Sequence, residues 1–338
     1  MAVAAGLSRV PRDTLRNIFR SILKEEKMSA LICGSFAYDH IMSFPERFAD
    51  HILPNRVHIL NVCFLVPEMR REFGGCAGNL AYALNLLQPD VAVPMGAVGR
   101  DFAPYGEWLQ KHGIPRRHIL EIEQTHTAQA FIVTDRDDNQ ITAFHPGAMD
   151  HAHRNRVGDC PRARIGVVAP DGRQGMVEHA RQFSEAGIPF LFDPGQGTPM
   201  FSREELLAFL EQAQWVSVNE YEWALLRERS GLDAGELARR VQAAIVTRGR
   251  EGSVIYTREE EFRIPPAPVE TETDPTGCGD AYRAGLLYGL LHEMGWETAG
   301  RLASLLGMLQ VGCRGTQNLD FAPDEIADRF RESFGYRL

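Results

Sequence analysis

The stretch "DPTGCGDAYRAGLLYGLL", residues 274–291, sets a glycine-rich loop directly before an apolar helix. Apolar residues at helical spacing predict one buried face for that helix: Ala281, Ala284, Leu287, Leu290 and Leu291. A helix N-terminus offers unpaired N–H donors and a partial positive charge, which suits a phosphate. Gly277 and Gly279, with the small Cys278 between them, let backbone amides approach such an anion without a Cβ in the way.

Asp280, in the first turn of this helix, needs a reason beyond helix capping. A cap is the plain interpretation of an acidic residue there, but a carboxylate beside a bound phosphoryl group repels it. We therefore interpret Asp280 as the base that takes the proton from a hydroxyl attacking a γ-phosphate. The amides of residues 277–279 would stabilise charge on the transferring group. No Gly-Lys-Ser/Thr follows, so the loop is not a Walker A loop.

The rest of the chain alternates short apolar runs with helix-like segments. The apolar runs are residues 29–33, 91–99, 165–169, 189–193, 215–218 and 244–247, and the helical segments are 78–87, 103–112, 174–186, 203–212 and 220–228. This alternation predicts an α/β fold with a mostly parallel sheet covered on both faces. Two regions depart from it, at about 40–66 and 127–145, the second reading as a hairpin with its turn at 135–139. We expect them to form a small β lid.

Composition limits the classes of partner. The formal net charge of −9 over 338 residues argues against a nucleic-acid partner, which requires a basic face. No apolar run reaches the ~18 residues of a membrane span. The six cysteines are scattered without a Cys-x-x-Cys pair, which is typical of a reducing compartment and predicts a cytoplasmic location.

Residues 1–27 read as an N-terminal extension ahead of a single domain at 28–338. Leu15, Ile18 and Ile22 follow helical spacing among several arginines, but Asp13 and Glu25 weaken a transit-peptide interpretation. We predict that a chain beginning at Met28 keeps full activity.

Two segments resemble one family. "DPTGCGDAYRAG" is similar to the Asp-Thr-x-Gly-Ala-Gly-Asp signature of the ribokinase-like (PfkB-type) carbohydrate and nucleoside kinases, with Pro275 and Cys278 as departures. "FGGCAGNLAYAL", residues 73–84, resembles the family's Gly-Gly-x-x-x-Asn segment and lies about 200 residues upstream. The resemblance covers residues 28 to 330. It implies a ribokinase-like three-layer αβα sandwich with a lid and ATP-dependent phosphorylation of an alcohol.

The resemblance also assigns residues that bind the substrate. Asp39, in "CGSFAYD", which we expect to close the first strand, matches an Asp that holds two hydroxyls, since a carboxylate accepts two hydrogen bonds. Gly74 and Gly75 allow close approach of a ligand, and Asn79 offers a donor and an acceptor.

Three further segments match elements around the nucleotide. In "VNEYE", Asn219 and Glu222 match an Asn-x-x-Glu element that organises Mg²⁺ and phosphate, often through water. "VTRGREGS" resembles a loop along the ATP phosphates and "GCRGTQ" one beside adenine; the residues assigned are Thr247, Arg248, Gly249, Gly252 and Gly315. Mg²⁺ and ATP are the expected cofactors, with K⁺ left open.

Several details favour a nucleoside as the phosphate acceptor. Phe36, Gln129 and Phe131 lie near the predicted hydroxyl-binding loop and lid, where aromatic faces suit a stacked base. "FDPGQG" and the extended 274–290 run resemble bacterial nucleoside kinases that phosphorylate the 5′-hydroxyl of adenosine, inosine or guanosine. The alternatives are a fructose or ribose kinase and a non-catalytic nucleoside sensor. The lid strands leave both a monomer and a homodimer open, since exposed strand edges pair readily.

Overall fold

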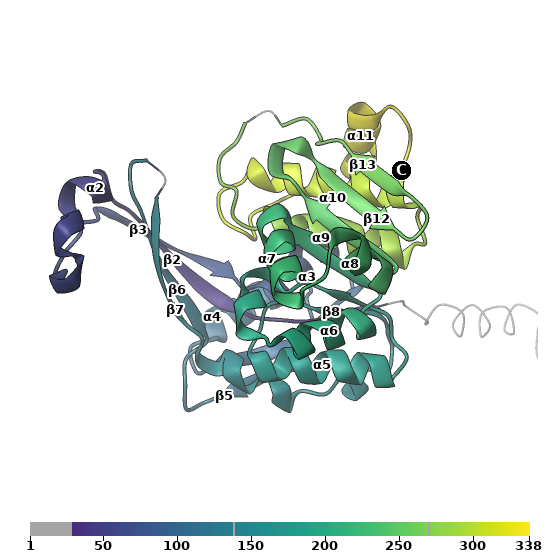
Figure 1. Ribbon diagram of the computed structural model, residues 1–338, viewed down its shortest axis with the longest axis horizontal. Helices are drawn as coiled ribbons and strands as arrows, with labels where there is room; N and C mark the ends of the chain where they lie inside the picture. The colour runs from purple at the N-terminus through teal and green to yellow at the C-terminus, as the bar shows by residue number, and fades with distance from the viewer. Residues whose placement is uncertain (1–28, 138, 270) are drawn as a thin grey trace, which may run out of the picture.

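The computed structural model describes residues 29–137, 139–269 and 271–338, which form one large and one small sheet (Figure 1). The large sheet has nine strands in the order β13-β12-β11-β10-β9-β8-β1-β4-β5. Its strands are β1 (Ser29–Cys33), β4 (Ala92–Gly99), β5 (His118–Ile122), β8 (Ala163–Val168), β9 (Phe190–Phe192), β10 (Trp215–Asn219), β11 (Ala243–Thr247), β12 (Ser253–Thr257) and β13 (Glu261–Ile264). The run from β5 to β11 is parallel, and β12 and β13 extend it antiparallel.

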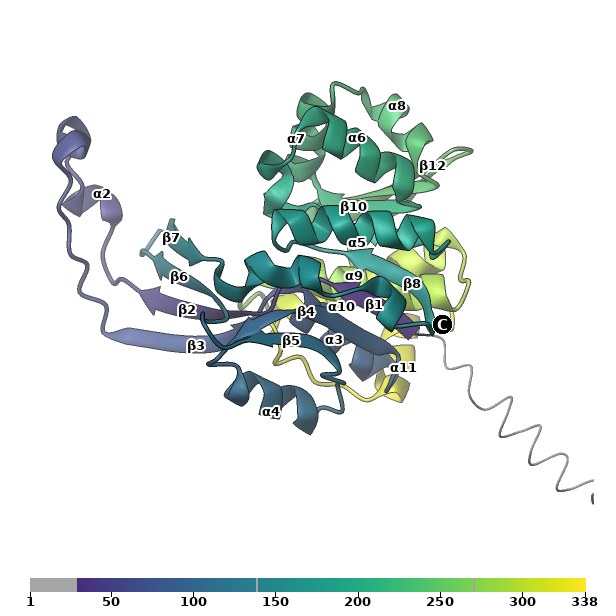
Figure 2. The same cartoon turned by 90° about the horizontal axis from the view of Figure 1, so that it is seen from below.

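Helices cover both faces of this sheet, because its central strands are apolar on both sides. Ala30 and Ile32 of β1 belong to one core, and Leu31 and Cys33 belong to the other. The first core includes α3 (Cys76–Leu87), α4 (Ala103–Lys111), α9 (Cys278–Leu291), α10 (Trp296–Val311) and α11 (Pro323–Phe334). The second includes α5 (Arg173–Glu185), α6 (Arg203–Gln212), α7 (Glu220–Ser230) and α8 (Ala234–Arg240). The predicted three-layer α/β sandwich is confirmed (Figure 2).

The small sheet projects from this body and has the order β3-β2-β6-β7. Its strands are β2 (Ala37–Ser43), β3 (Glu68–Gly74), β6 (Ala128–Thr134) and β7 (Gln140–His145). The predicted hairpin turn is present, with the Asp135 carboxylate accepting the backbone N–H groups of Asp137 and Asn139.

The range 40–66 predicted for the lid was partly wrong. The lid strand β3 begins at Glu68, beyond the predicted range. Residues 44–66 instead contain α2 (Phe48–His51) and the short 3₁₀ helix at Pro54–Ile59. The sequence "EMRREFG" of β3 is largely charged, because much of the strand is exposed, so it lacked the apolar signal that marks a strand.

Two sequence predictions stand apart from this fold. The extension at 1–27 and Met28 lie outside the described residues, so the activity of a chain beginning at Met28 stays a prediction. Among the helices that the structure describes, none is both long and apolar enough to cross a bilayer.

Candidate active site

A cavity of about 500 Å³ lies between the lid and the carboxyl ends of the parallel strands, where open α/β sheets bind ligands. Its walls come from the lid, the loops after β1, β8 and β9, and the first turns of three helices. The residues that line it are Ser35, Ala37, Asp39, Gly75, Cys76, Phe144, Met149, Pro170, Asp171, Asp193, Gly195, Gln196, Gly197, Met200, Glu222, Asp280 and Arg283.

Asp280 is buried in the first turn of α9 and faces this cavity. Gly277 caps the helix at φ 80°, a left-handed conformation that favours glycine, and the helix begins at Cys278. Burial raises the pKa of the Asp280 carboxyl, while Arg283 and a hydrogen bond from Asn79 act in the opposite direction. The buried Asp280 carboxylate therefore faces the cavity from the first turn of α9, and anion binding by the amides of residues 277–279 stays a prediction.

Asn79 holds Asp280 and is held in turn by residues distant in sequence. Its side-chain Nδ2 donates to Asp280 Oδ2 at 2.8 Å, and its Oδ1 accepts from Gln317 Nε2 at 3.0 Å. Gln317 Oε1 accepts from the indole N–H of Trp108 at 3.0 Å. Asn79 is buried and is not one of the cavity-lining residues. In this structure α3 turns Asn79 towards α9, where it contacts Asp280, and its binding of substrate hydroxyls stays a prediction.

A buried charge cluster adjoins Asp280. Arg283, one turn further along α9, contacts Asp193 through Nε to Oδ2 and Nη2 to Oδ1, both at 2.8 Å. Glu222 Oε2 lies 3.9 Å from Arg283 Nη2. Burial raises the pKa of Asp193 to about 7, against the lowering effect of Arg283. Arg283 and Asp193 were not predicted as site residues. The signals in the sequence are the i, i+3 spacing of Asp280 and Arg283 and the position of Asp193 directly after a strand.

Asp39 enters the cavity from the lid. It is the third residue of β2, so it does not close the first strand as the sequence suggested. Burial raises the pKa of its carboxyl to about 6, and the like charges of Asp280 and Glu72 add to the effect. A Cβ on Gly74 would lie 2.2 Å from Asp39 Oδ2, so Gly74 makes room for this carboxylate. Gly75 lines the cavity at φ 88°.

Three residues predicted to contact a base do not line this cavity. Phe36 is fully buried and packs edge-to-face on Phe102 and Tyr105, so it is a core residue. Gln129 and Phe131 alternate along β6 with residues that share a sheet face with Asp39, and therefore point the opposite way. Gln129 donates to Asp101 and Phe131 stacks on His40. Phe144 on β7 lines the cavity instead.

The predicted nucleotide residues occupy loops at the same edge of the sheet. Asn219 caps α7 in a reciprocal box with Glu222, and of these two only Glu222 lines the cavity. Asn219 and Thr247 are neighbours in the β10–β11 register. The next loop residues are Arg248, whose Nε lies 3.4 Å from Glu220, and Gly249 and Gly252, with φ of 53° and 82°.

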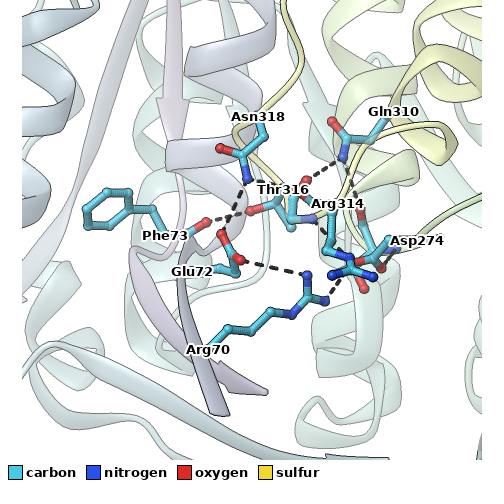
Figure 3. Close-up of polar contacts among 10 residues, drawn as sticks. Arg70, Glu72, Phe73, Asp274, Gln310, Arg314, Thr316 and Asn318 are labelled. Atoms are coloured by element: carbon cyan, nitrogen blue, oxygen red, sulfur yellow. Dashed lines mark hydrogen bonds and ion pairs between the residues drawn. The ribbon is translucent and has the colours of Figure 1, made fainter. Parts of the chain in front are cut away.

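The lid strand β3 is fastened to the loop that carries the glycine motif (Figure 3). Arg70 Nη2 lies 2.9 Å from Asp274 Oδ2, which also accepts the N–H of Gly315 at 3.2 Å. Thr316 donates to the backbone carbonyl of Phe73. Burial alone would raise the pKa of Asp274, but these hydrogen bonds and that from Thr276 outweigh it and hold the pKa low. Gly315, predicted beside the adenine, serves this junction at φ 80°.

Comparison with known proteins identifies the family. The model of the pfkB family of carbohydrate kinases matches residues 38–323. The chain belongs to the PfkB family. It is therefore a phosphotransferase that acts on a hydroxyl group, and its large sheet and lid are those of the ribokinase-like fold.

Two relatives, one of them in two structures, are similar over nearly their whole length. The nucleoside kinase of Methanothermobacter thermautotrophicus is 30% identical over 319 residues, which are 92% of this chain and 98% of that protein. The structure of Burkholderia thailandensis nucleoside kinase in complex with inosine is 49% identical with a TM-score of 0.85, covering 91% of this chain and 99% of the other. The same protein in complex with ADP-inosine is 50% identical with a TM-score of 0.83, covering 91% and 97%.

This PfkB-family chain departs from the usual signature at Pro275 and Cys278 without disturbing the loop. Thr276 still donates its N–H to Asp274 Oδ1 at 3.0 Å. Burial raises the pKa of the Cys278 thiol to about 12, so it stays neutral and acts as a small residue between two glycines.

Proposed function

We propose that this chain is an ATP-dependent nucleoside kinase that transfers the γ-phosphate to the ribose 5′-hydroxyl of an adenosine-, inosine- or guanosine-type nucleoside, with Asp280 as general base. The observation that carries the proposal is the buried Asp280 carboxylate in the first turn after Gly277–Gly279, facing a cavity that Asp39 enters from the lid. The structures of the relative with inosine and with ADP-inosine support the choice of acceptor and donor.

In this proposal different groups of the protein act on the ribose, on the attacking hydroxyl and on the phosphoryl group. Asp39 accepts hydrogen bonds from two ribose hydroxyls and so orients the sugar. Asp280 accepts the proton of the 5′-hydroxyl as the oxygen attacks phosphorus; burial strengthens it as a base, and Asn79 orients it. The first-turn amides of α9 stabilise the charge that develops on the γ-phosphoryl oxygens.

Mg²⁺ is part of the proposal, and the cavity fits a weakly coordinated ion. The described residues hold no group of three ligating side chains. Glu222 is a carboxylate in the wall near Asp280, and its neighbour Asp193 is already paired with Arg283. Mg²⁺ commonly keeps several waters and binds substrate phosphates with one or two carboxylates, so Glu222 would hold it partly through water. The ion would neutralise phosphate charge. Activation by K⁺ stays a separate prediction, checked by exchanging K⁺ for Na⁺.

The acceptor and the base are tested by two measurements. ADP release with a panel of nucleosides, ribose and fructose separates a nucleoside kinase from a sugar kinase, and nucleoside binding without ADP release would favour a sensor. In Asp280→Asn we expect nucleoside binding to persist and turnover to fall by roughly 10³-fold or more, because the base is lost. Near-normal turnover in that variant would remove Asp280 from the mechanism.

We also propose that the lid pairs with a second copy of the chain. Apolar side chains are largely exposed along the segment between β2 and β3: Leu53, Val57, Ile59, Leu60 and Leu65. Such a set favours an interface over free solvent, which supports the homodimer over the monomer. Sedimentation of the full chain against a Leu60→Glu/Leu65→Glu variant tests this. We further propose that the protein is cytoplasmic, which its scattered cysteines support, and that its kinase domain begins at residue 28, which the sequence pattern supports.

A further inference from the structure

Besides Asp280 and its charge cluster, the cavity wall includes residues of the loops after β8 and β9. The backbone and apolar groups around it lie close together: a Cβ on Gly172 would be 2.5 Å from the carbonyl oxygen of Met149, and one on Gly195 would be 2.5 Å from Pro170. Met200 and Phe144 complete the apolar lining. Asp171, between Pro170 and Gly172, is the charged group in the wall here.

Asp171 is buried, and only one of its two carboxylate oxygens has a hydrogen-bond partner. The residue is 2% exposed, and Oδ1 accepts the N–H of Gly172 at 2.9 Å. Oδ2 is also buried, and no described residue gives it a hydrogen bond. A buried acceptor without a donor loses its hydrogen bonds to water without replacement, so its presence in a ligand cavity requires an explanation.

Asp171 is separate from the catalytic charges. Asp280 interacts with Asn79, Arg283 and Glu222. The carboxyl of Asp171 is instead influenced by its own burial, which raises its pKa well above the usual range, and by the nearby Asp150. Phosphoryl transfer therefore gives Asp171 no role, and its unpaired oxygen is left for another part of a bound molecule.

The surroundings of Asp171 match a flat heteroaromatic ring. The side chains of Phe144, Met149, Pro170 and Met200 offer apolar contact area, and the Asp171 carboxyl offers one hydrogen-bond acceptor. A sugar without a base would fill neither. We propose that Asp171 is a specificity residue whose Oδ2 accepts a hydrogen bond from an N–H on the edge of a purine base. The inference rests on the proposed nucleoside kinase function and names the group that reads the base.

The proposal makes a specific prediction about ligands. Inosine carries one ring N–H on this edge, and guanosine and adenosine carry amino N–H groups, whereas purine riboside has no N–H on its base. The wild-type protein should therefore prefer inosine to purine riboside by about tenfold or more in kcat/KM, mostly through KM.

The test replaces Asp171 by Leu, which has a similar shape and no acceptor. We expect Asp171→Leu to lower the preference for inosine over purine riboside to about twofold or less, with kcat for inosine within about threefold of wild type. Asp171→Asn keeps an acceptor oxygen and should retain much of the preference. Asp150→Asn removes a nearby exposed charge outside the cavity and serves as the matched control, with the ratio unchanged.

Nucleoside binding measured by calorimetry without ATP tests the role of Asp171 separately from the proposed kinase activity. If no nucleoside is phosphorylated by wild type, the proposed function fails, but the inosine-to-purine-riboside affinity ratio still tests Asp171. An unchanged ratio in Asp171→Leu, with a wild-type melting profile, overturns the inference. Should Asp171→Leu not fold, Asp171→Ala is measured instead, and an unchanged ratio there has the same meaning.

Discussion

Replacing Asn79 by Ala removes the side-chain amide that donates to Asp280 at 2.8 Å. A hydrogen bond to a charged group contributes about 1.5–3 kcal/mol, and one pKa unit corresponds to about 1.4 kcal/mol. Asn79 lowers the pKa of Asp280, so its removal should raise that pKa. The ionised form is the active base, and the acid limb of kcat should move to higher pH by the same amount.

The assay is kcat at saturating ATP and nucleoside, followed by ADP release from pH 5 to 9. For Asn79→Ala we expect a large loss of rate near pH 6 that is largely recovered near pH 9. Gln317 contacts Asn79, Tyr105 and Trp108 but not Asp280, so the shift in Gln317→Leu should be less than half as large, and the double variant should shift no further than Asn79→Ala.

The control is Asn85→Ala on the same helix, where the amide donates to the backbone of His112 and does not line the cavity. It should leave the acid limb in place. A kcat that falls equally at every pH in Asn79→Ala would mean only structural damage, which melting curves would report. An unshifted limb with normal folding would refute the argument that Asn79 tunes the base.

Three further results are expected. Gly74→Ala would place a Cβ 2.2 Å from Asp39 Oδ2, so KM for the nucleoside should rise at least about tenfold, while Gly158→Ala, with open space around it, should leave KM unchanged; equal KM values would contradict the placement of Asp39. Arg283→Met strands the buried Asp193, so urea denaturation at pH 7 should show a loss of about 3–5 kcal/mol, partly restored by adding Asp193→Asn; a loss below about 1 kcal/mol would contradict the ion pair. The nucleoside KM should rise as pH falls through about 6, the pKa of Asp39, because the neutral acid accepts hydrogen bonds less strongly; a flat profile would contradict that role. The folded pKa of Asp39 exceeds its ordinary 3.8, so this group makes the ligand-free protein less stable as pH rises from about 4 to 6, the opposite direction to substrate binding.

The sequence by itself determined the parts that depend on local chemistry. Strands apolar on both sides between amphipathic helices predicted the covered parallel sheet, and the structure confirms it. The sequence around Gly277–Gly279 predicted where α9 begins, because the left-handed glycine and the apolar face of the helix are neighbours in the chain. Asp280 and Asp39 were found for the same reason, through motifs of a few residues.

Only the tertiary structure decided which way the remaining side chains face. Asn79 meets Asp280 across 201 positions and Gln317 across 238, so no local pattern could show that its amide is used internally. Asp39 lies in the cavity and Gln129 outside it because a strand alternates its faces, and the register that chooses between them is set by pairing with distant residues. Burial and charge at Asp171 likewise arise where loops from separate strands converge.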